Sequence, residues 1–229
     1  LVEGKGYTGG IITEGGTALH SFYNLWKAFP GVEKRQVVRG IPQEIIDRLE
    51  TMGATSGHAE MELGYDYDSV CTAIDTELYK LATLQMLAEA GVDLKLNTLL
   101  AGAVTEDGRV TAVLTESRSG REAFAAHAFV DCTGYGDLCA HAGASFTEPN
   151  DHPVANSIGL GGVNLESYRD FLQTNAALKE IAWGKRSGEE NRIVRLSGHS
   201  VRLPDHIRDA ARSIGLAMVT TTVHDDYFM

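Results

Sequence analysis

The clearest helical pattern in the chain lies between residues 41 and 52. Its apolar positions share one helical face and are Ile41, Ile45, Ile46, Leu49 and Met52. Pro42 stands where a first helical turn tolerates proline, and Gly53 stands where helices commonly end. The pattern predicts a helix over 41–52 that packs through this face.

A longer helical pattern runs from Asp68 to about Ala90, and Gly91 is a natural end for it. Its expected buried side consists of Ile74, Leu78, Leu81 and Leu84. Residues 92–97 then alternate apolar and polar side chains, which predicts a half-buried strand.

Residues 99–126 have the pattern of three short strands joined by tight turns. The strands are expected at 99–104, 110–116 and 122–126, with turns at 106–109 and 119–120. This stretch therefore predicts an antiparallel β-meander.

The stretch 128–144 is the best candidate for a ligand loop. Phe129–Val130 predicts a short buried strand, the chain breaks at Thr133–Gly134 and again at Gly136, and a helix of small residues follows. Glycines let a ligand approach the backbone, and a helix start offers unpaired N–H groups. Asp137 lies in the first turn and can accept a sugar hydroxyl. The pattern fits a phosphate or sugar site and equally an ordinary connection between a strand and a helix.

The C-terminal third begins after a boundary rich in proline at 149–153. Residues 157–163 predict a strand and turn, and Asn164 predicts the cap of a helix. A polar loop is expected over 183–191, and Asp205 is expected to cap a second helix.

The composition narrows the class of protein. The 229 residues carry a net charge of -11, which disfavours a nucleic-acid partner and an anionic membrane surface. No stretch has the length of an apolar membrane span. Three cysteines without paired spacing favour a reducing cytoplasm, and we expect Cys132 and Cys139 to be small core residues.

Six stretches, in order along the chain, carry a family resemblance. They are L-V-E at 1–3, Y-T-G-G-I-I-T at 7–13, G-I-P-Q-E-I-I-D-R-L at 40–49, L-A-E-A-G-V-D-L-K-L-N-T at 87–98, V-D-C-T-G-Y-G-D at 130–137 and L-G-G-V-N-L-E at 160–166. Together they resemble the FAD-dependent oxidoreductases, flavoproteins of the two-dinucleotide-binding-domain type. The resemblance implies an α/β fold and FAD as the cofactor. It implies part of a Rossmann-like FAD-binding domain over 1–148, with the meander inserted at about 99–126, and the start of a substrate or cap domain over 149–229.

In such proteins a G-x-G-x-x-G segment binds the FAD pyrophosphate, and here it would lie before Leu1. The chain begins without methionine, and both ends have the character of cut ends. We therefore expect an interior segment of a longer protein, which alone would hold FAD weakly and be inactive.

The resemblance assigns cofactor roles to residues near the N-terminus. Glu3 matches the acidic residue whose carboxylate accepts the hydroxyls of the adenosine ribose. Gly9, Gly10 and Thr13 match a loop that passes close to the flavin side of the cofactor. Leu100 matches a position whose backbone meets the adenine.

The resemblance also assigns the glycine-rich turn. Thr133, Gly134, Gly136 and Asp137 match a turn near the pyrophosphate and ribityl chain. Tyr135 stands where the family often has aspartate, so the hydrogen bonding there is left open.

Catalytic residues are not assigned, and no metal site is predicted. Acid–base candidates in the C-terminal part are His152, His199, His206 and His224. Candidates for orienting a carboxylate are Arg39, Arg192, Arg195 and Arg202. The residues of His224-Asp225-Asp226 would point to opposite sides of an extended segment, which disfavours a metal cluster.

The leading functional hypothesis is hydride or electron transfer through FAD on an unidentified small substrate, with an electron-transfer protein as a further expected partner. One alternative is an α/β enzyme that binds a nicotinamide or a sugar nucleotide. The other is a flavin-free homologue that binds a partner protein and catalyses nothing.

Overall fold

The structure is a computed structural model of the whole chain. It describes residues 1–14, 19–20, 24–25, 35–65, 68–147, 160–199, 204–214, 218–224 and 227–228. The chain divides into two compact units. The first unit comprises Leu1–Thr8 and Leu84–Ala155, and the second comprises Gly9–Thr83 and Asn156–Met229. Each unit is described by itself below.

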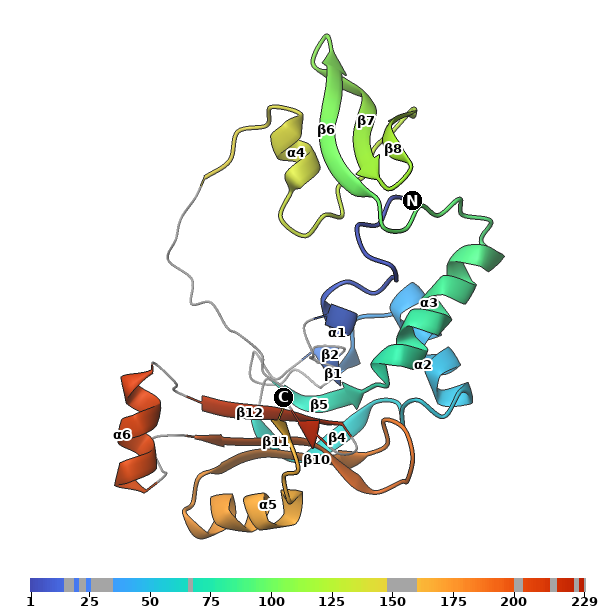
Figure 1. Cartoon of the computed structure of the whole chain (residues 1–229). Helices are drawn as coiled ribbons and strands as arrows, with labels where there is room; N and C mark the ends of the chain where they lie inside the picture. Colours follow the sequence, from blue (N-terminus) through green and yellow to red (C-terminus); the bar gives the residue numbers. More distant parts are fainter. Residues whose placement is uncertain are drawn as a thin grey trace. The chain divides into compact units, whose positions relative to one another are not determined.

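The first unit contains the predicted meander. Its three strands pair in chain order and are β6 (Leu99–Glu106), β7 (Arg109–Ser117) and β8 (Gly120–Ala125). Asp107 and Gly108 turn the chain between β6 and β7 with φ of 49° and 74°, the conformation that a tight hairpin requires. The short helix α4 (Asp137–His141) packs against β6 (Figure 1). The expectation of an antiparallel meander is confirmed.

The other two strands expected in the first unit are not formed as predicted. Residues 92–97 contribute one isolated parallel bridge, between Lys95 and Val2. Phe129–Val130 is not a strand, and the side chain of Val130 is 81% exposed. A buried strand needs neighbours on both edges, and none of the described strands pairs with this segment.

The second unit is built on an eight-stranded antiparallel sheet, in the order β1-β5-β4-β10-β11-β12-β13-β9. The strands are β1 (Leu19–His20), β4 (Ala59–Tyr65), β5 (Asp68–Ala73), β9 (Leu160–Gly161), β10 (Leu178–Gly184), β11 (Arg192–His199), β12 (Met218–His224) and β13 (Tyr227–Phe228). A separate small sheet pairs β2 (Asn24–Leu25) with β3 (Arg35–Gln36).

The helices outside the first unit are α1 (Ile11–Glu14), α2 (Ile41–Thr51), α5 (Leu165–Thr174) and α6 (Asp205–Ser213), while the division between the units falls within α3 (Thr76–Glu89). The helix predicted over 41–52 is confirmed as α2. Asn164 caps α5 as predicted, because its side-chain oxygen accepts the N–H of Ser167 at 2.9 Å. The second predicted helix is confirmed as α6, in which Asp205 is the first helical residue rather than a cap before it.

The helix predicted from Asp68 is wrong in its first third. Residues 68–73 form β5, and the helix begins only after Asp75, whose carboxylate accepts the N–H groups of Glu77 and Leu78. The helix buries Tyr79 and Ala82, whereas Leu81 and Leu84 are more than two-fifths exposed. Of the expected buried residues, Ile74 is buried before the helix and Leu78 packs against the same core cluster.

The core of the second unit lies on the sheet. On one side, Leu172 of α5 packs with Ile181 and Leu196 of β10 and β11, and α5 lies along these strands (Figure 1). A second cluster joins α2 and α3 through Leu49 and Ala82. The polar loop predicted over 183–191 is shorter than expected, because β10 runs to Gly184.

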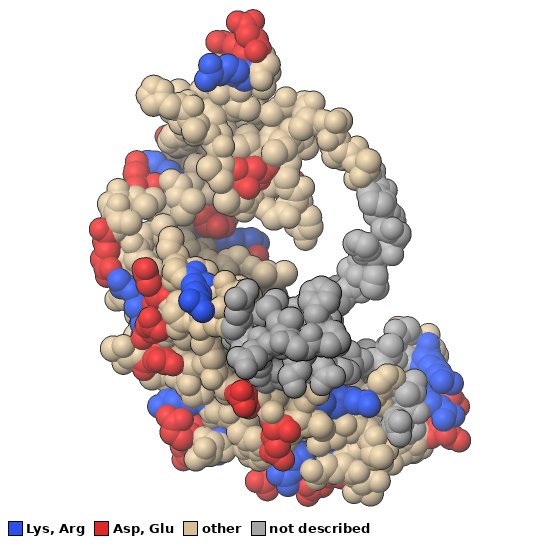
Figure 2. Space-filling model, turned by 180° about the vertical axis from the view of Figure 1, so that it is seen from behind, with Lys and Arg blue, Asp and Glu red and all other residues tan. Residues whose placement is uncertain are grey.

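The fold of the described residues is mixed α/β, with helices and antiparallel sheets. The predicted boundary at 148–149 lies outside the described residues, and the assignment of cofactor and substrate domains stays a prediction. Among the described helices, none is both long and apolar enough to cross a membrane. Basic side chains are scattered among acidic ones on the face shown in Figure 2, as expected for an acidic chain.

Candidate functional site

The first unit brings the N-terminal segment and the start of β6 together. The N–H of Glu3 donates to the carbonyl of Lys95, and the N–H of Thr98 donates to the carbonyl of Glu3, at 2.8 and 3.0 Å. The Glu3 carboxylate is held at the end of this pairing by the N–H of Lys5, at 2.9 Å. Leu100 follows Thr98 by two residues in β6 and is half-buried. The two residues expected at the ribose and the adenine therefore lie on neighbouring segments.

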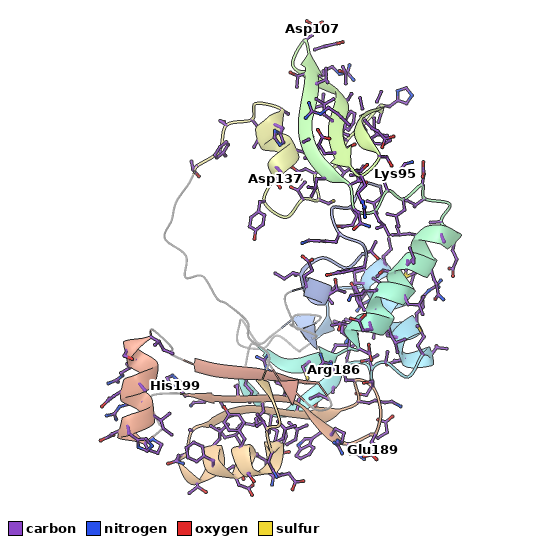
Figure 3. All side chains as sticks on the ribbon, in the orientation of Figure 1. Lys95, Asp107, Asp137, Arg186, Glu189 and His199 are labelled. Carbon is purple, nitrogen blue, oxygen red and sulfur yellow. The ribbon has the colours of Figure 1, made fainter. Side chains whose placement is uncertain are left out.

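The Thr133–Asp137 turn has an open backbone. Gly134 and Gly136 have φ of 90° and 76°, which residues with a side chain rarely adopt. A Cβ added to either glycine would meet no protein atom within 4 Å. The absence of a side chain is thus required by backbone conformation and leaves open space in front of the turn, which fits the approach of a ligand. Asp137 lies at the start of α4 and is exposed (Figure 3).

Asp131, which the sequence analysis did not single out, organises this turn. One carboxylate oxygen accepts the N–H and the hydroxyl of Thr133 at 3.0 and 2.7 Å, and the other accepts the N–H of Cys139 at 2.9 Å. The Thr133 hydroxyl in turn accepts the N–H of Asp137 at 2.8 Å. These bonds, above all that from the N–H of Thr133, hold the pKa of the Asp131 carboxyl well below its usual range. The signal in the sequence was Asp-x-Thr, a pattern that commonly forms this local turn.

The hydrogen bonds of Asp131 correct one expectation. The N–H groups of Asp137 and Cys139 at the start of α4 already have side-chain acceptors, so they are not available to a phosphate. The expectation that Cys132 and Cys139 are core residues is also wrong, because both are exposed. A hydrogen bond to the Asp131 carboxylate raises the pKa of the Cys139 thiol.

The remaining cofactor candidates belong to the second unit. Gly9 has φ of 119°, and a Cβ there would come within 2.5 Å of Thr13 and 3.1 Å of Tyr79. The Thr13 hydroxyl donates to the carbonyl of Gly10 at 3.0 Å. A Cβ on Gly10 would meet no atom within 4 Å. Packing alone therefore requires glycine at position 9, whereas position 10 is open. The structure does not place this loop relative to the Thr133–Asp137 turn.

Among the arginine candidates, Arg195 of β11 is committed to a buried ion pair. Its guanidinium lies 3.0 Å from the carboxylate of Glu180 on β10, and Ser197 donates to the same carboxylate at 2.5 Å. Glu180 is only 1% exposed, so the pair is shielded from water. This arginine does not present a free guanidinium to a carboxylate substrate.

A second polar cluster joins α2 to β5 and the segment before β4. Gln43 donates to Asp47, and its carbonyl oxygen lies 2.9 Å from Nε2 of His58. Nδ1 of His58 lies 2.6 Å from the hydroxyl of Thr72. With the Gln43 oxygen as acceptor, His58 carries its proton on Nε2 and accepts the Thr72 proton at Nδ1. Burial lowers the pKa of His58, and the carboxylates of Glu50 and Asp47 oppose this.

No group of three or more His, Cys, Asp or Glu side chains gathers around a common metal position within the part of the chain that the structure describes. The motif His224-Asp225-Asp226 lies partly outside those residues.

The parallel bridge between Val2 and Lys95 and the open glycine turn beside α4 are features that a nucleotide-binding α/β protein would have. The family described as FAD dependent oxidoreductase matches residues 1–212, and the chain belongs to this family. FAD is the cofactor of the family. The curated proteins and the solved structures yielded no significant match.

The residues of the first unit fit FAD chemically. Glu3 offers a carboxylate to sugar hydroxyls, and the open space at Gly134 and Gly136 would admit the cofactor close to the backbone. Thr133 and Asp131 fix the shape of that backbone. When bound, the isoalloxazine ring of FAD supplies the redox chemistry.

Proposed function

We propose that this FAD-dependent oxidoreductase transfers a hydride or electrons between its flavin and a small organic substrate. The observation that carries the proposal is the backbone pairing of residues 1–5 with residues 95–98, in which Glu3 lies alongside the segment that leads to Leu100. An acidic residue at the end of such a pairing is suited to accept two ribose hydroxyls. The family match over residues 1–212 supports the same assignment.

The protein's role in this reaction is to bind, orient and shield the cofactor. Glu3 would hold the ribose, the backbone near Leu100 would lie against the adenine, and the Thr133–Asp137 turn would contact the chain between the two rings. Gly10 and Thr13 would lie on the flavin side. We leave the group that moves the substrate proton unassigned.

The environment and partners form part of the proposal. All three cysteines are free, and Cys132 and Cys139 are exposed, which supports a reducing cytoplasmic location. A small-molecule substrate and an electron-transfer protein are proposed partners. The net charge of -11 supports the absence of nucleic-acid binding.

Substitution of Glu3 tests the cofactor assignment. Glu3→Ala removes the acceptor of two charge-assisted hydrogen bonds, each worth about 1.5–3 kcal/mol, so the FAD affinity of the full-length protein should fall by at least about a hundredfold. Glu106→Ala is the matched control, because Glu106 is an exposed glutamate at the end of β6 in the same unit. Titration calorimetry with FAD reads out both variants. Equal FAD affinity in the two variants would refute the role of Glu3.

Reduction of the bound flavin tests the reaction class. Candidate small organic donors are added to the FAD-loaded protein without oxygen, and loss of visible flavin absorbance is followed. The proposal expects at least one donor to bleach the flavin and a later acceptor to restore it. A bound flavin that no donor and no artificial reductant changes would contradict an oxidoreductase function.

A further inference from the structure

Asp131 lies just before the glycine turn and touches both ends of it. Its carboxylate accepts the N–H of Thr133, at the start of the turn, and the N–H of Cys139, which lies eight residues after Asp131 in α4. Between them the chain passes through Gly134 and Gly136, which have no Cβ and can therefore adopt many backbone conformations. Without hydrogen bonds that hold it, this segment would populate many backbone conformations, and cofactor binding would have to order it.

The hydrogen bonds of Asp131 and Thr133, which we call the clamp, depend on each other. Asp131 accepts the Thr133 hydroxyl at 2.7 Å, and that hydroxyl accepts the N–H of Asp137 at 2.8 Å. The direction of the proton on Thr133 is thereby fixed toward Asp131. All partners lie between Asp131 and Cys139, so these hydrogen bonds form without a ligand.

The same bonds occupy two of the N–H groups at the start of α4. The negative carboxylate occupies the N–H of Cys139, and the Thr133 hydroxyl occupies the N–H of Asp137. An incoming phosphate would meet a like charge and donors already in use. The contribution of Asp131 must therefore be to the shape of the turn.

Resting on the proposed FAD function, we propose that Asp131 is a positioning residue, whose carboxylate pre-forms the Thr133–Asp137 turn in the conformation that receives the cofactor. Pre-forming the turn removes the ordering cost from cofactor binding. The depressed pKa of Asp131 agrees with a carboxylate that stays ionised at all physiological pH values.

Asp131→Asn tests this with little change of volume. The asparagine oxygen can still serve Thr133, but its amide would point N–H groups at the N–H of Cys139. FAD affinity should fall by about tenfold or more, the scale of a lost charge-assisted hydrogen bond. Asp107→Asn is the matched control, because Asp107 is exposed, lies in the β6–β7 turn at φ of 49°, and asparagine tolerates that conformation.

A second pair of variants separates positioning from folding. Thr133→Ser keeps the hydroxyl and should retain FAD, whereas Thr133→Val keeps the volume and should lose affinity as Asp131→Asn does. Because the two groups act as one clamp, Asp131→Asn combined with Thr133→Val should cost little more than either change alone. Each variant is titrated with FAD by calorimetry, and its thermal midpoint without FAD is recorded.

Retained FAD affinity in folded Asp131→Asn, or equal affinity in Thr133→Val and Thr133→Ser, would overturn the inference while leaving the proposed function intact. Failure of Asp131→Asn to fold leaves the Thr133 pair to decide. A wild-type protein that does not bind FAD would overturn the proposed function and this inference with it.

Discussion

Replacing Gly136 with alanine separates the strain of the backbone from contact with the cofactor. Gly136 lies immediately before α4 with φ of 76° and ψ of 30°, and a Cβ there would meet no protein atom within 4 Å. The left-handed conformation alone should cost about 1–2 kcal/mol of unfolding free energy. Gly143, just after α4, has φ of 83° and an equally open surrounding, so Gly143→Ala should carry the same strain.

The two variants should differ only when FAD is present. If the cofactor approaches the backbone at Gly136, the added methyl group overlaps with it at a cost of about 1–3 kcal/mol, as for overpacking in a core. That corresponds to a loss of FAD affinity of about five- to 150-fold, at 1.4 kcal/mol for each factor of ten. Gly143→Ala should bind FAD as the wild type does.

Calorimetric titration gives the affinities, and thermal unfolding without FAD gives the strain. Gly136→Val should exaggerate the effect, since a β-branched side chain tolerates positive φ still less well. Equal FAD affinity in Gly136→Ala and Gly143→Ala would refute the role of this turn in cofactor binding, whatever the stability of the two proteins.

Three further predictions concern the second unit and its stability. Gly198→Ala should lower the free energy of unfolding by about 1–3 kcal/mol, because the added Cβ would lie 2.5 Å from the buried side chain of Leu172 in α5. In the control Gly102→Ala the added Cβ would lie 3.5 Å from its nearest neighbour, so the change should be near neutral. Chemical denaturation compares the two variants, and an equal loss of unfolding free energy would contradict the packing of α5. Glu180→Gln should cost about 3–5 kcal/mol by leaving Arg195 charged and without its ionised partner, and an unfolding midpoint like that of the wild type would show that the pair contributes nothing. Because burial holds the pKa of His58 below its usual value of 6.5, the free energy of unfolding should decline as pH falls from about 6.5 through the folded pKa. Unfolding curves of His58→Gln at several pH values should lack that part of the pH dependence.

The sequence predicted best those elements that rest on local signals. The α2 helix followed from one apolar face and its end residues, and the meander followed from alternation and the Asp107-Gly108 turn. Asn164 and Asp205 correctly marked the starts of two helices. In each case the information that determines the element lies within a few neighbouring residues.

The large antiparallel sheet was missed because its central strands do not alternate. Strands β10 and β11 are buried on both faces, and their inward positions include Glu180, Arg195 and Ser197. Charged residues at those positions resemble surface residues unless the partner on the neighbouring strand is known. The pairing of Glu180 with Arg195 is a tertiary contact that only the register supplies.

The sequence also did not reveal the contacts of the candidate site that join residues far apart in the chain. Asp131 precedes the glycine turn by two residues, yet its role depends on an N–H eight residues away at Cys139. The assignment of a core position to Cys139 failed because α4 buries only Leu138 on its packed side. Phe129–Val130 has the composition of a buried strand, but composition does not supply a neighbouring strand.

The central claim is that the protein binds FAD in preference to other nucleotides, through Glu3, the backbone near Leu100 and the Thr133–Asp137 turn. Titration calorimetry of one preparation of the full-length protein with FAD, NAD⁺ and UDP-glucose tests it most directly. The account predicts saturable one-to-one binding of FAD with an affinity well above that for either of the other two. Tighter binding of NAD⁺ or UDP-glucose than of FAD, or no saturable FAD binding at all, would contradict it.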